Sequence, residues 1–301
     1  MLIHHDVQES GSMNARSVHR EVTRMNEVVE RTELLLPGPA QALASLLDVP
    51  MPELDRGEGL PLLWHWIYLL ERPAQIDLGP DGHPARATVP APPGPGRRRM
   101  WAGGRVRLRG TLRCDVTATK RTTVLAVREK QGRSGPLTFV VVGHQVIQNG
   151  RIVVDEEQDI VYREAVEPSA QPESAEAGPA SVLPAEADEW PIDVSPTMLF
   201  RFSALTYNGH RIHYDRDYAR EVEGYPGLLT HGPLQALAMA EAARAHGSGG
   251  DQLFEYRLLA PLFDHQGMVV RAVKEPEGTT ATAVRDVYGR QTASGTLRSL
   301  G

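Results

Sequence analysis

Residues 232–246 read GPLQALAMAEAARAH and are preceded by YPGLLTH at 225–231. The residues of the longer stretch are small and apolar on almost every side, which predicts a helix buried all round rather than one with a single apolar stripe. Three strand-like stretches follow, at 253–261, 268–274 and 279–288, with 291–297 as a further candidate. A buried helix followed by an antiparallel sheet predicts an α+β domain whose sheet wraps around the helix, the arrangement called a hotdog.

The first half of the chain carries a similar order of features. A helix candidate at 37–47 (PGPAQALASLL) precedes an apolar stretch, 60–70, whose type the pattern leaves open. Strand-like runs then follow at 105–108, 114–120, 122–129, 137–148 and 151–162. Asn149-Gly150 separates the last two and is a strong hairpin signal. We therefore expect a double hotdog, with two antiparallel sheets, each wrapped around a central helix, that pair edge to edge.

One composition shift divides the chain. Residues 164–189 are rich in Pro, Ala, Ser and Glu and have few large apolar side chains, so they predict a linker. The expected organisation is a disordered N-terminus (1–26), an N-terminal hotdog (27–163), the linker, and a C-terminal hotdog (190–301). The proline-rich stretch 90–99 (PAPPGPGRRR) predicts a loop within the first half.

Composition narrows the class of protein. The chain has 301 residues, a net charge of −6 and a pI of about 6.0, which argue against nucleic acid as the main partner. The single cysteine, Cys114, excludes an intramolecular disulfide. No run of about 18 apolar residues is present, so we expect no membrane span and a cytoplasmic protein.

The densest group of reactive side chains lies at 206–215 (TYNGHRIHYD). Ser195 and Pro196 predict the start of a helix in which Leu199, Phe202 and Leu205 recur at helical spacing. That spacing stops at Tyr207, which places the group on a turn after the helix. The stretch 225–233 then opens the buried helix, whose free backbone N–H groups form an oxyanion or phosphate site. A proton-transfer residue beside such donors suits chemistry next to a thioester carbonyl.

Residues 207–213 resemble the motif of MaoC-like and hydratase-2 enzymes, Gly-Asp-x-Asn-Pro-(aliphatic)-His, whose Asp and His are catalytic. His213 matches the motif histidine and Ile212 the aliphatic position. Tyr207, Asn208, His210 and Arg211 replace the glycine, the aspartate, the asparagine and the proline, respectively. This variant is itself similar to the branch of mesaconyl-CoA (itaconyl-CoA) hydratases and fungal-type 3-hydroxyacyl-thioester dehydratases.

Further stretches carry the same resemblance, which covers roughly residues 27–163 and 190–300. They are 60–66 (LPLLWHW), 99–104 (RMWAGG), 130–137 (KQGRSGPL) and 156–163 (EEQDIVYR). The resemblance implies a hydro-lyase without a metal or redox cofactor, with an acyl-CoA thioester as its partner and one site per chain, and it leaves a homodimer open. The acyl group that it implies is short, branched or dicarboxylic, such as mesaconyl or itaconyl.

The resemblance also implies roles for single residues. His213 is the expected general acid and base, Asn208 holds the water, and the N–H of Gly232 polarises the thioester oxygen. An amide cannot take a proton, so either His213 acts alone or Asp215 or Asp217 assists it. The expected substrate-binding residues are Tyr207, His210, Arg211, His231 and Arg257.

Other interpretations stay open at this point. Trp64 and Trp66 fit core packing better than an acyl pocket. Residues 97–99 (RRR) fit a solvated loop face or a contact with CoA phosphates. His210, His213 and Asp215 have a spacing that a metal accepts, but that is common by chance. The glycine pairs 103–104 and 132/135 are interpreted as turns. A hotdog thioesterase and a non-catalytic acyl-thioester binding protein are the rival functions.

Overall fold

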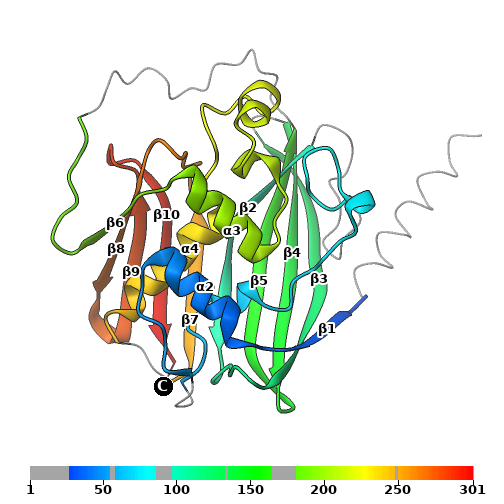
Figure 1. The fold of residues 1–301 in the computed structure, drawn as a ribbon, viewed down its shortest axis with the longest axis vertical. Coiled ribbons are helices and arrows are strands. Elements are labelled where there is room, and N and C mark those ends of the chain that lie inside the picture. The colour runs from blue at the N-terminus through cyan, green and yellow to red at the C-terminus, as the bar shows by residue number, and fades with distance from the viewer. Residues whose placement is uncertain are drawn as a thin grey trace, which may run out of the picture.

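The structure is a computed structural model that describes residues 27–54, 58–85, 97–132, 135–164, 181–247 and 250–300. Within these residues the chain forms one ten-stranded sheet in the order β1-β3-β4-β5-β2-β7-β10-β9-β8-β6, with every neighbouring pair antiparallel (Figure 1). The strands are β1 (Val29–Leu34), β2 (Arg97–Leu108), β3 (Thr117–Gly132), β4 (Gly135–Gln148), β5 (Arg151–Glu164), β6 (Glu189–Ile192), β7 (Gln252–Leu258), β8 (Met268–Lys274), β9 (Thr279–Arg285) and β10 (Gln291–Ser299). The helices are α2 (Pro37–Leu47), α3 (Pro196–Thr206) and α4 (Gly232–Arg244), with short turns η2 (Trp64–Ile67), η3 (Gln75–Asp77), η4 (Arg211–His213), η5 (Tyr218–Val222) and η6 (Pro276–Gly278).

The two halves join where β2 pairs with β7, so their sheets meet edge to edge as the sequence predicts. Gly103 and Gly104 lie inside β2 at this seam, not in a turn as their sequence suggests. A Cβ on Gly103 would lie 2.4 Å from the carbonyl oxygen of Tyr256. Glycine is therefore required here because two backbones approach closely.

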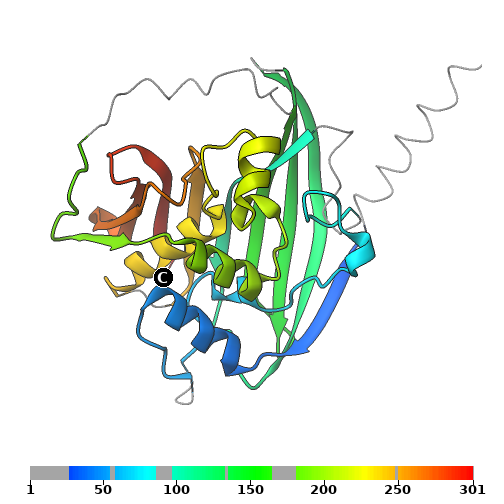
Figure 2. The same cartoon turned by 45° about the horizontal axis from the view of Figure 1, so that its top comes forward.

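In the second half the sheet curves around α4, as Figures 1 and 2 show. α4 packs against β7, β8, β9 and β10. Its alanines and leucines are almost fully buried, which confirms the helix expected from its composition. Phe254, Val270 and Val284 face it from three of these strands as part of one apolar core.

In the first half the helix lies elsewhere. α2 packs mainly against α3 and η2, over the side of α4 that faces away from the strands (Figures 1 and 2). The stretch Leu60 to Leu70, whose type the sequence left open, folds as the short helix η2 between two left-handed residues, Leu63 and Leu69. Trp64 is fully buried and Trp66 is half-buried, so both tryptophans belong to the core.

Two buried carboxylates fix this stretch. Trp64 Nε1 donates to Glu241 Oε1 of α4 at 2.6 Å. Glu156 of β5 accepts from Trp66 Nε1 and pairs with His65 Nε2, both at 2.9 Å. Burial raises the pKa of Glu156, but the hydrogen bonds and charge interactions with His65, His144 and Gln158 together lower that pKa to about 2. A charged Glu156 therefore holds the segment against the first-half sheet.

The strand pattern differs from the prediction at several places. The Asn149-Gly150 turn is confirmed, with both residues at positive φ between β4 and β5. The two runs expected at 114–120 and 122–129 join, from Thr117 onward, in the single strand β3, because a bulge between Val124 and Ala126 keeps it paired with β4. The edge strands β1 and β6 were not predicted, since each is short.

Residues 97–99 were predicted as a loop but belong to β2 and pair with residues 162–164. The prolines that suggested a loop come before them, and the rest of that loop, 86–96, lies outside the described residues.

The predicted domain boundaries stay predictions. Residues 1–26 and most of the linker, 165–180, lie outside the described part of the chain, and residues 181–188 form no helix or strand. No helix among the described residues is long and apolar enough to cross a membrane.

We expect Trp64→Phe to lower the free energy of unfolding by about 1–3 kcal/mol, because the buried Glu241 loses its indole donor while the ring volume is largely kept. Chemical denaturation of both proteins measures this. The matched control is Trp190→Phe, since the half-buried Trp190 indole donates no hydrogen bond within the described residues. Equal losses in the two variants would contradict a specific role for the Trp64–Glu241 bond.

Candidate active site

The site starts at the end of α3. Ser195 caps the helix by accepting from the N–H of Met198, as predicted, and Tyr207 ends it in the left-handed conformation. Asn208 follows, and its side-chain Oδ1 accepts from the N–H of His210 at 3.0 Å. This local bond shapes the turn. The Oδ1 atom of Asn208 is therefore occupied, and the Nδ2 amide is the group left to contact a water.

His213 lies on η4, buried, and is held by its backbone neighbours. Its Nδ1 donates to the carbonyl oxygen of Leu229 at 2.7 Å. Burial lowers the pKa of the His213 imidazole to about 4, although the bond to Leu229 acts in the opposite direction. A neutral ring with its proton on Nδ1 leaves the Nε2 lone pair free. Within the described residues no hydrogen bond engages that atom, so His213 is prepared to accept a proton.

His231 stacks on His213 with ring centroids 3.6 Å apart and an interplanar angle of 16°. Its Nε2 is hydrogen-bonded to Ser203 Oγ at 2.9 Å. Burial, with the nearby His213 and His210, holds the pKa of His231 well below its ordinary value. Two buried polar atoms here, His231 Nδ1 and Thr230 Oγ1, have no partner among the described residues. The ring therefore supports His213, and the unpaired atoms mark a polar place beside it.

α4 begins directly after His231. Pro233 has no N–H, while the N–H groups of Leu234 and Gln235 both bond to the His231 carbonyl. The N–H of Gly232 has no acceptor among the described residues, so it is the free donor at the positive end of the helix dipole. Such a donor stabilises an oxyanion.

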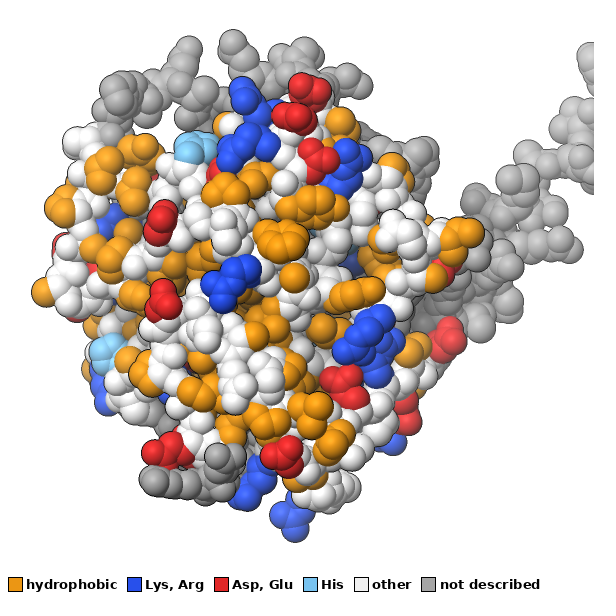
Figure 3. Space-filling model, in the orientation of Figure 1, with side chains coloured by type: hydrophobic (Ala, Val, Ile, Leu, Met, Phe, Trp, Pro, Cys, Tyr) orange, Lys and Arg blue, Asp and Glu red, His pale blue; other side chains and the backbone are white. Residues whose placement is uncertain are grey.

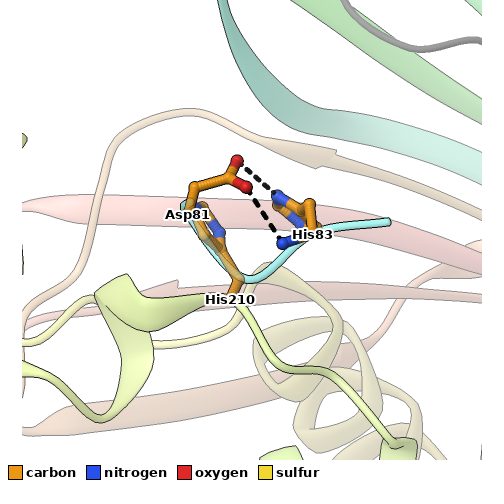
Figure 4. Close-up of side chains that lie close together, drawn as sticks. All are labelled: Asp81, His83 and His210. Carbon is orange, nitrogen blue, oxygen red and sulfur yellow. Dashed lines mark hydrogen bonds and ion pairs between the residues drawn. The ribbon is translucent and has the colours of Figure 1, made fainter. Parts of the chain in front are cut away.

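The first half contributes two residues that the sequence analysis missed. Asp81 and His83, in the loop after η3, lie beside His210 of the second half (Figure 4). His83 Nδ1 lies 3.3 Å from Asp81 Oδ2, and its backbone N–H donates to Asp81 Oδ1 at 3.0 Å. The His83 ring lies 3.9 Å from the His210 ring. The only local hint was the turn sequence Gly-Pro-Asp-Gly-His-Pro at 79–84.

His210 lies between this loop and His213. Its ring meets the His213 ring edge-on, with centroids 5.5 Å apart. Burial and the neighbours His83, His213 and Arg99 strongly lower the pKa of His210. His210 is therefore a neutral ring inside the site. The sequence left open a metal site formed by His210, His213 and Asp215. The structure instead brings together the side-chain ligand atoms of Asp81, His83 and His210, which lie within 4.8 Å of one another.

Arg211 and Asp215 build the site but do not face His213. Arg211 forms an ion pair with Asp215 at 2.8 Å and donates to the Pro80 carbonyl at 3.1 Å. Asp215 also accepts from the N–H of Tyr218, which with Arg211 lowers the pKa of its carboxyl. Both residues hold the turn and the first-half loop together, so Asp215 is already engaged and is not placed to assist His213.

Two predicted substrate-binding residues are not brought to this group. Tyr207 is 55% exposed at the end of α3. Arg257 is exposed on β7, on the face opposite Phe254 and Tyr256, which point toward α4. Side chains alternate along a strand, so Arg257 points away from the helix and the histidines.

A different arginine lies near the histidines. Arg99 of β2 is half-buried and is one of the charges that lower the pKa of His210. The Arg99 side chain has no ion pair or hydrogen bond among the described residues. Arg98, next to it, is paired with Glu223 at 2.7 Å and lies over the Tyr225 ring. The Arg99 guanidinium is therefore available to an anion in the site.

Comparisons with known proteins fit this arrangement. The profile of the hydroxyacyl-thioester dehydratase type 2 family matches residues 63–264, which include both the first-half loop and the turn with His213. The chain belongs to this family. It is 46% identical over 225 residues to the mesaconyl-C(4)-CoA hydratase of Chloroflexus aurantiacus, covering 75% of this chain and 79% of that protein. It is 41% identical over 80 residues to the mitochondrial hydroxyacyl-thioester dehydratase type 2 of Schizosaccharomyces pombe, covering 26% and 27% of the two chains. These relatives are hydratases and dehydratases, and this member of the family is a hydro-lyase.

Solved structures confirm the double hotdog fold. HtdX of Mycobacterium tuberculosis matches with a TM-score of 0.64 at 14% identity, over 91% of this chain and 100% of that one. A MaoC-like dehydratase from Phytophthora capsici has the same TM-score at 15% identity, over 91% and 95%. A second M. tuberculosis protein, described as a double hotdog, has a TM-score of 0.51 at 16% identity, over 90% and 94%.

The buried histidines predict a pH-dependent stability. In the unfolded chain their imidazoles bind protons near pH 6.5, whereas folded His213 does so only near pH 4, so acidification through this window favours unfolding. Between about pH 6.5 and pH 4, we expect the titration of His213 alone to lower the free energy of unfolding by about 3 kcal/mol. Denaturant unfolding at a series of pH values should give a flatter dependence for His213→Gln. His265→Gln, at an exposed histidine, should keep the wild-type slope. An unchanged slope in His213→Gln would mean that the pKa of His213 is the same in the folded and the unfolded chain.

Proposed function

We propose that the chain catalyses reversible addition of water to an α,β-unsaturated acyl-CoA, forming a 3-hydroxyacyl-CoA. The observation that carries this proposal is the pairing of a buried, neutral His213 with the free N–H of Gly232 at the start of α4. A base and an oxyanion donor are the two groups that such an addition needs. Their spatial link is His231, which stacks on His213 and directly precedes Gly232.

In the hydration direction His213 Nε2 accepts a proton from water while the water oxygen bonds to the β-carbon. Electrons of the double bond move toward the thioester, and the Gly232 N–H stabilises the negative charge that develops on its oxygen. Protonation of the α-carbon completes the addition, and the reverse steps eliminate water. The amide Nδ2 of Asn208 lies on the same turn and would hold the water, while His210 and His231 keep the space around it polar and neutral.

The finer proposal is a short acyl group with a free carboxylate. Arg99 supports it, because a half-buried guanidinium without a partner among the described residues would bind a carboxylate beside His210. The name of the Chloroflexus relative, a mesaconyl-C(4)-CoA hydratase, agrees with an acid of this kind. Mesaconyl-CoA is therefore our first candidate, and itaconyl-CoA the second.

Charge distribution supports a small-molecule partner. In the face drawn in Figure 3, Lys and Arg side chains are interspersed with Asp and Glu, so this face has no basic stripe of the kind that binds nucleic acid. The predicted location is the cytoplasm. The mass of the protein in solution tests whether it forms a homodimer.

The direct test incubates the protein with crotonyl-CoA, mesaconyl-CoA and the matching 3-hydroxyacyl-CoA thioesters and follows gain or loss of one water by mass spectrometry. We expect turnover by the wild type and a loss of about 100- to 10,000-fold in His213→Ala, since general acid–base catalysis contributes this much. His265→Gln is the matched control and should retain full activity. Release of free CoA thiol would instead indicate a thioesterase, and binding without turnover would indicate a binding protein.

A second experiment tests the carboxylate. Arg99→Gln should lower kcat/KM for mesaconyl-CoA by about 10- to 100-fold, since a buried charged hydrogen bond contributes about 1.5–3 kcal/mol. The value for crotonyl-CoA, which lacks the free carboxylate, should stay near that of the wild type. Arg257→Gln, on the opposite face of the sheet, is the control. Equal losses for both thioesters would point to a CoA phosphate as the partner of Arg99 and contradict a carboxylate contact.

A further inference from the structure

The Asp81–His83 loop is held against the turn that carries His213 by backbone contacts. The carbonyl of Asp81 accepts from the N–H of Arg211 at 2.9 Å. Gly82, at φ +85°, lies directly against Gly209, and a Cβ on Gly82 would lie 1.9 Å from the Gly209 carbonyl oxygen. No other residue fits this contact. The position of the first-half loop relative to the second-half turn is therefore fixed by the main chain.

Asp81 and His83 have the geometry of an acid–base pair. The carboxylate contacts His83 through both its ring Nδ1 and its backbone N–H, so it orients the imidazole, and the bond to His83 helps to lower the pKa of the Asp81 carboxyl. His83 Nε2 is left without a hydrogen bond among the described residues. The two nitrogens of the His213 ring are arranged in the same way: Nδ1 is bound to a carbonyl oxygen and Nε2 is free.

The two sites differ in the charge that they favour. His213 faces a neutral carbonyl in a buried place and is kept unprotonated, whereas His83 faces a carboxylate and its side chain is 23% exposed. His210 connects them, with its ring 3.9 Å from that of His83 and 5.5 Å from that of His213. One site therefore suits a base and the other an acid, and a single ring separates them.

Resting on the function proposed above, we propose that His83, oriented by Asp81, is the second acid–base group of the site and exchanges the proton at the α-carbon of the acyl thioester. In hydration, His213 takes a proton from the water that bonds to the β-carbon, and protonated His83 gives a proton to the α-carbon. The double-bond electrons form the new α-carbon–hydrogen bond. Transfer of the proton from His213 to His83, through His210 or solvent, restores both groups and balances the cycle. The carboxylate that the motif lacks at Asn208 is thus supplied by Asp81 from the other half.

A shared cation is the competing interpretation of these three side chains. Lone pairs of an imidazole lie in the ring plane, and the His83 and His210 rings lie over one another, tilted by 35°, with centroids 3.9 Å apart. Rings in this arrangement do not direct both nitrogens at one point. The Asp81–His83 bond also satisfies the carboxylate without an ion. The geometry therefore favours proton transfer.

The test compares wild type, Asp81→Asn, His83→Gln and the double variant with crotonyl-CoA, between about pH 5 and 9 where imidazoles titrate. The titratable and charged groups that face the pair are His210, His213, Arg99, Arg211 and Tyr218, all of which stay unchanged in these variants. His83→Gln should lower kcat by about 100-fold or more with little change in KM, and the double variant should be no worse because the residues act as a unit. Asp81→Asn should move the high-pH limit of the rate toward lower pH, because the protonated imidazole loses its carboxylate.

A second readout separates proton transfer from a structural role. The wild type should incorporate deuterium from D₂O at the α-carbon of 3-hydroxybutyryl-CoA, and His83→Gln should lose this exchange while it unfolds at the wild-type temperature. His265→Gln, beside Asp264 at 3.6 Å, is the matched control for an Asp–His pair outside the site. Wild-type kcat, pH profile and deuterium exchange in His83→Gln would overturn the inference, and so would activity that a chelator abolishes and a divalent cation restores. If instead the wild type hydrates no thioester, the proposed function itself fails.

Discussion

The segment Leu60 to Leu70 depends on two buried carboxylates, and the rest of the molecule depends on that segment. Glu156 binds it to the first-half sheet through His65 and Trp66, and Glu241 binds it to α4 through Trp64. The backbone also ties it to the edge of the sheet, where the N–H of Leu69 donates to Glu33 of β1. Burying a carboxylate is costly unless hydrogen bonds replace its hydration, and each of these carboxylates has several. The segment thus takes the place of the helix that the second half has.

This anchoring determines what can happen further along the chain. The loop of Asp81 and His83 follows the segment by about a dozen residues, and the segment is itself bonded to α4 of the second half through Trp64. The close contact of Gly82 with Gly209 then fixes the position of this loop against the turn that carries His213. The stretch of chain from Leu60 to His83 therefore links the packing of the core to the position of the site residues, in addition to the sheet.

Local sequence features predicted the elements that local forces determine. The bounds of α2 and β8 and the first residue of α4 were predicted to the residue, because proline starts, capping and periodicity are encoded within a few positions. The turn with His213 was found in the same way. Asp81 and His83 were missed since they join the site through packing between residues more than a hundred positions apart, which no local pattern contains. The exposed position of Arg257 could not be predicted, because which face of β7 is buried depends on the helix beneath it. The loop predicted at residues 97–99 was wrong because strand pairing with β5 outweighed the nearby prolines.

The seam between β2 and β7 has a consequence for the separability of the two halves. Each half supplies a similar sheet, yet the second holds its long helix in the curve of its strands, while the first sends the loop of Asp81 and His83 across to its neighbour. The second half in turn reaches back to β2, where Glu223 pairs with Arg98. The two halves are therefore not interchangeable: exchanging them, or pairing two copies of either one, would not rebuild the cluster of histidines.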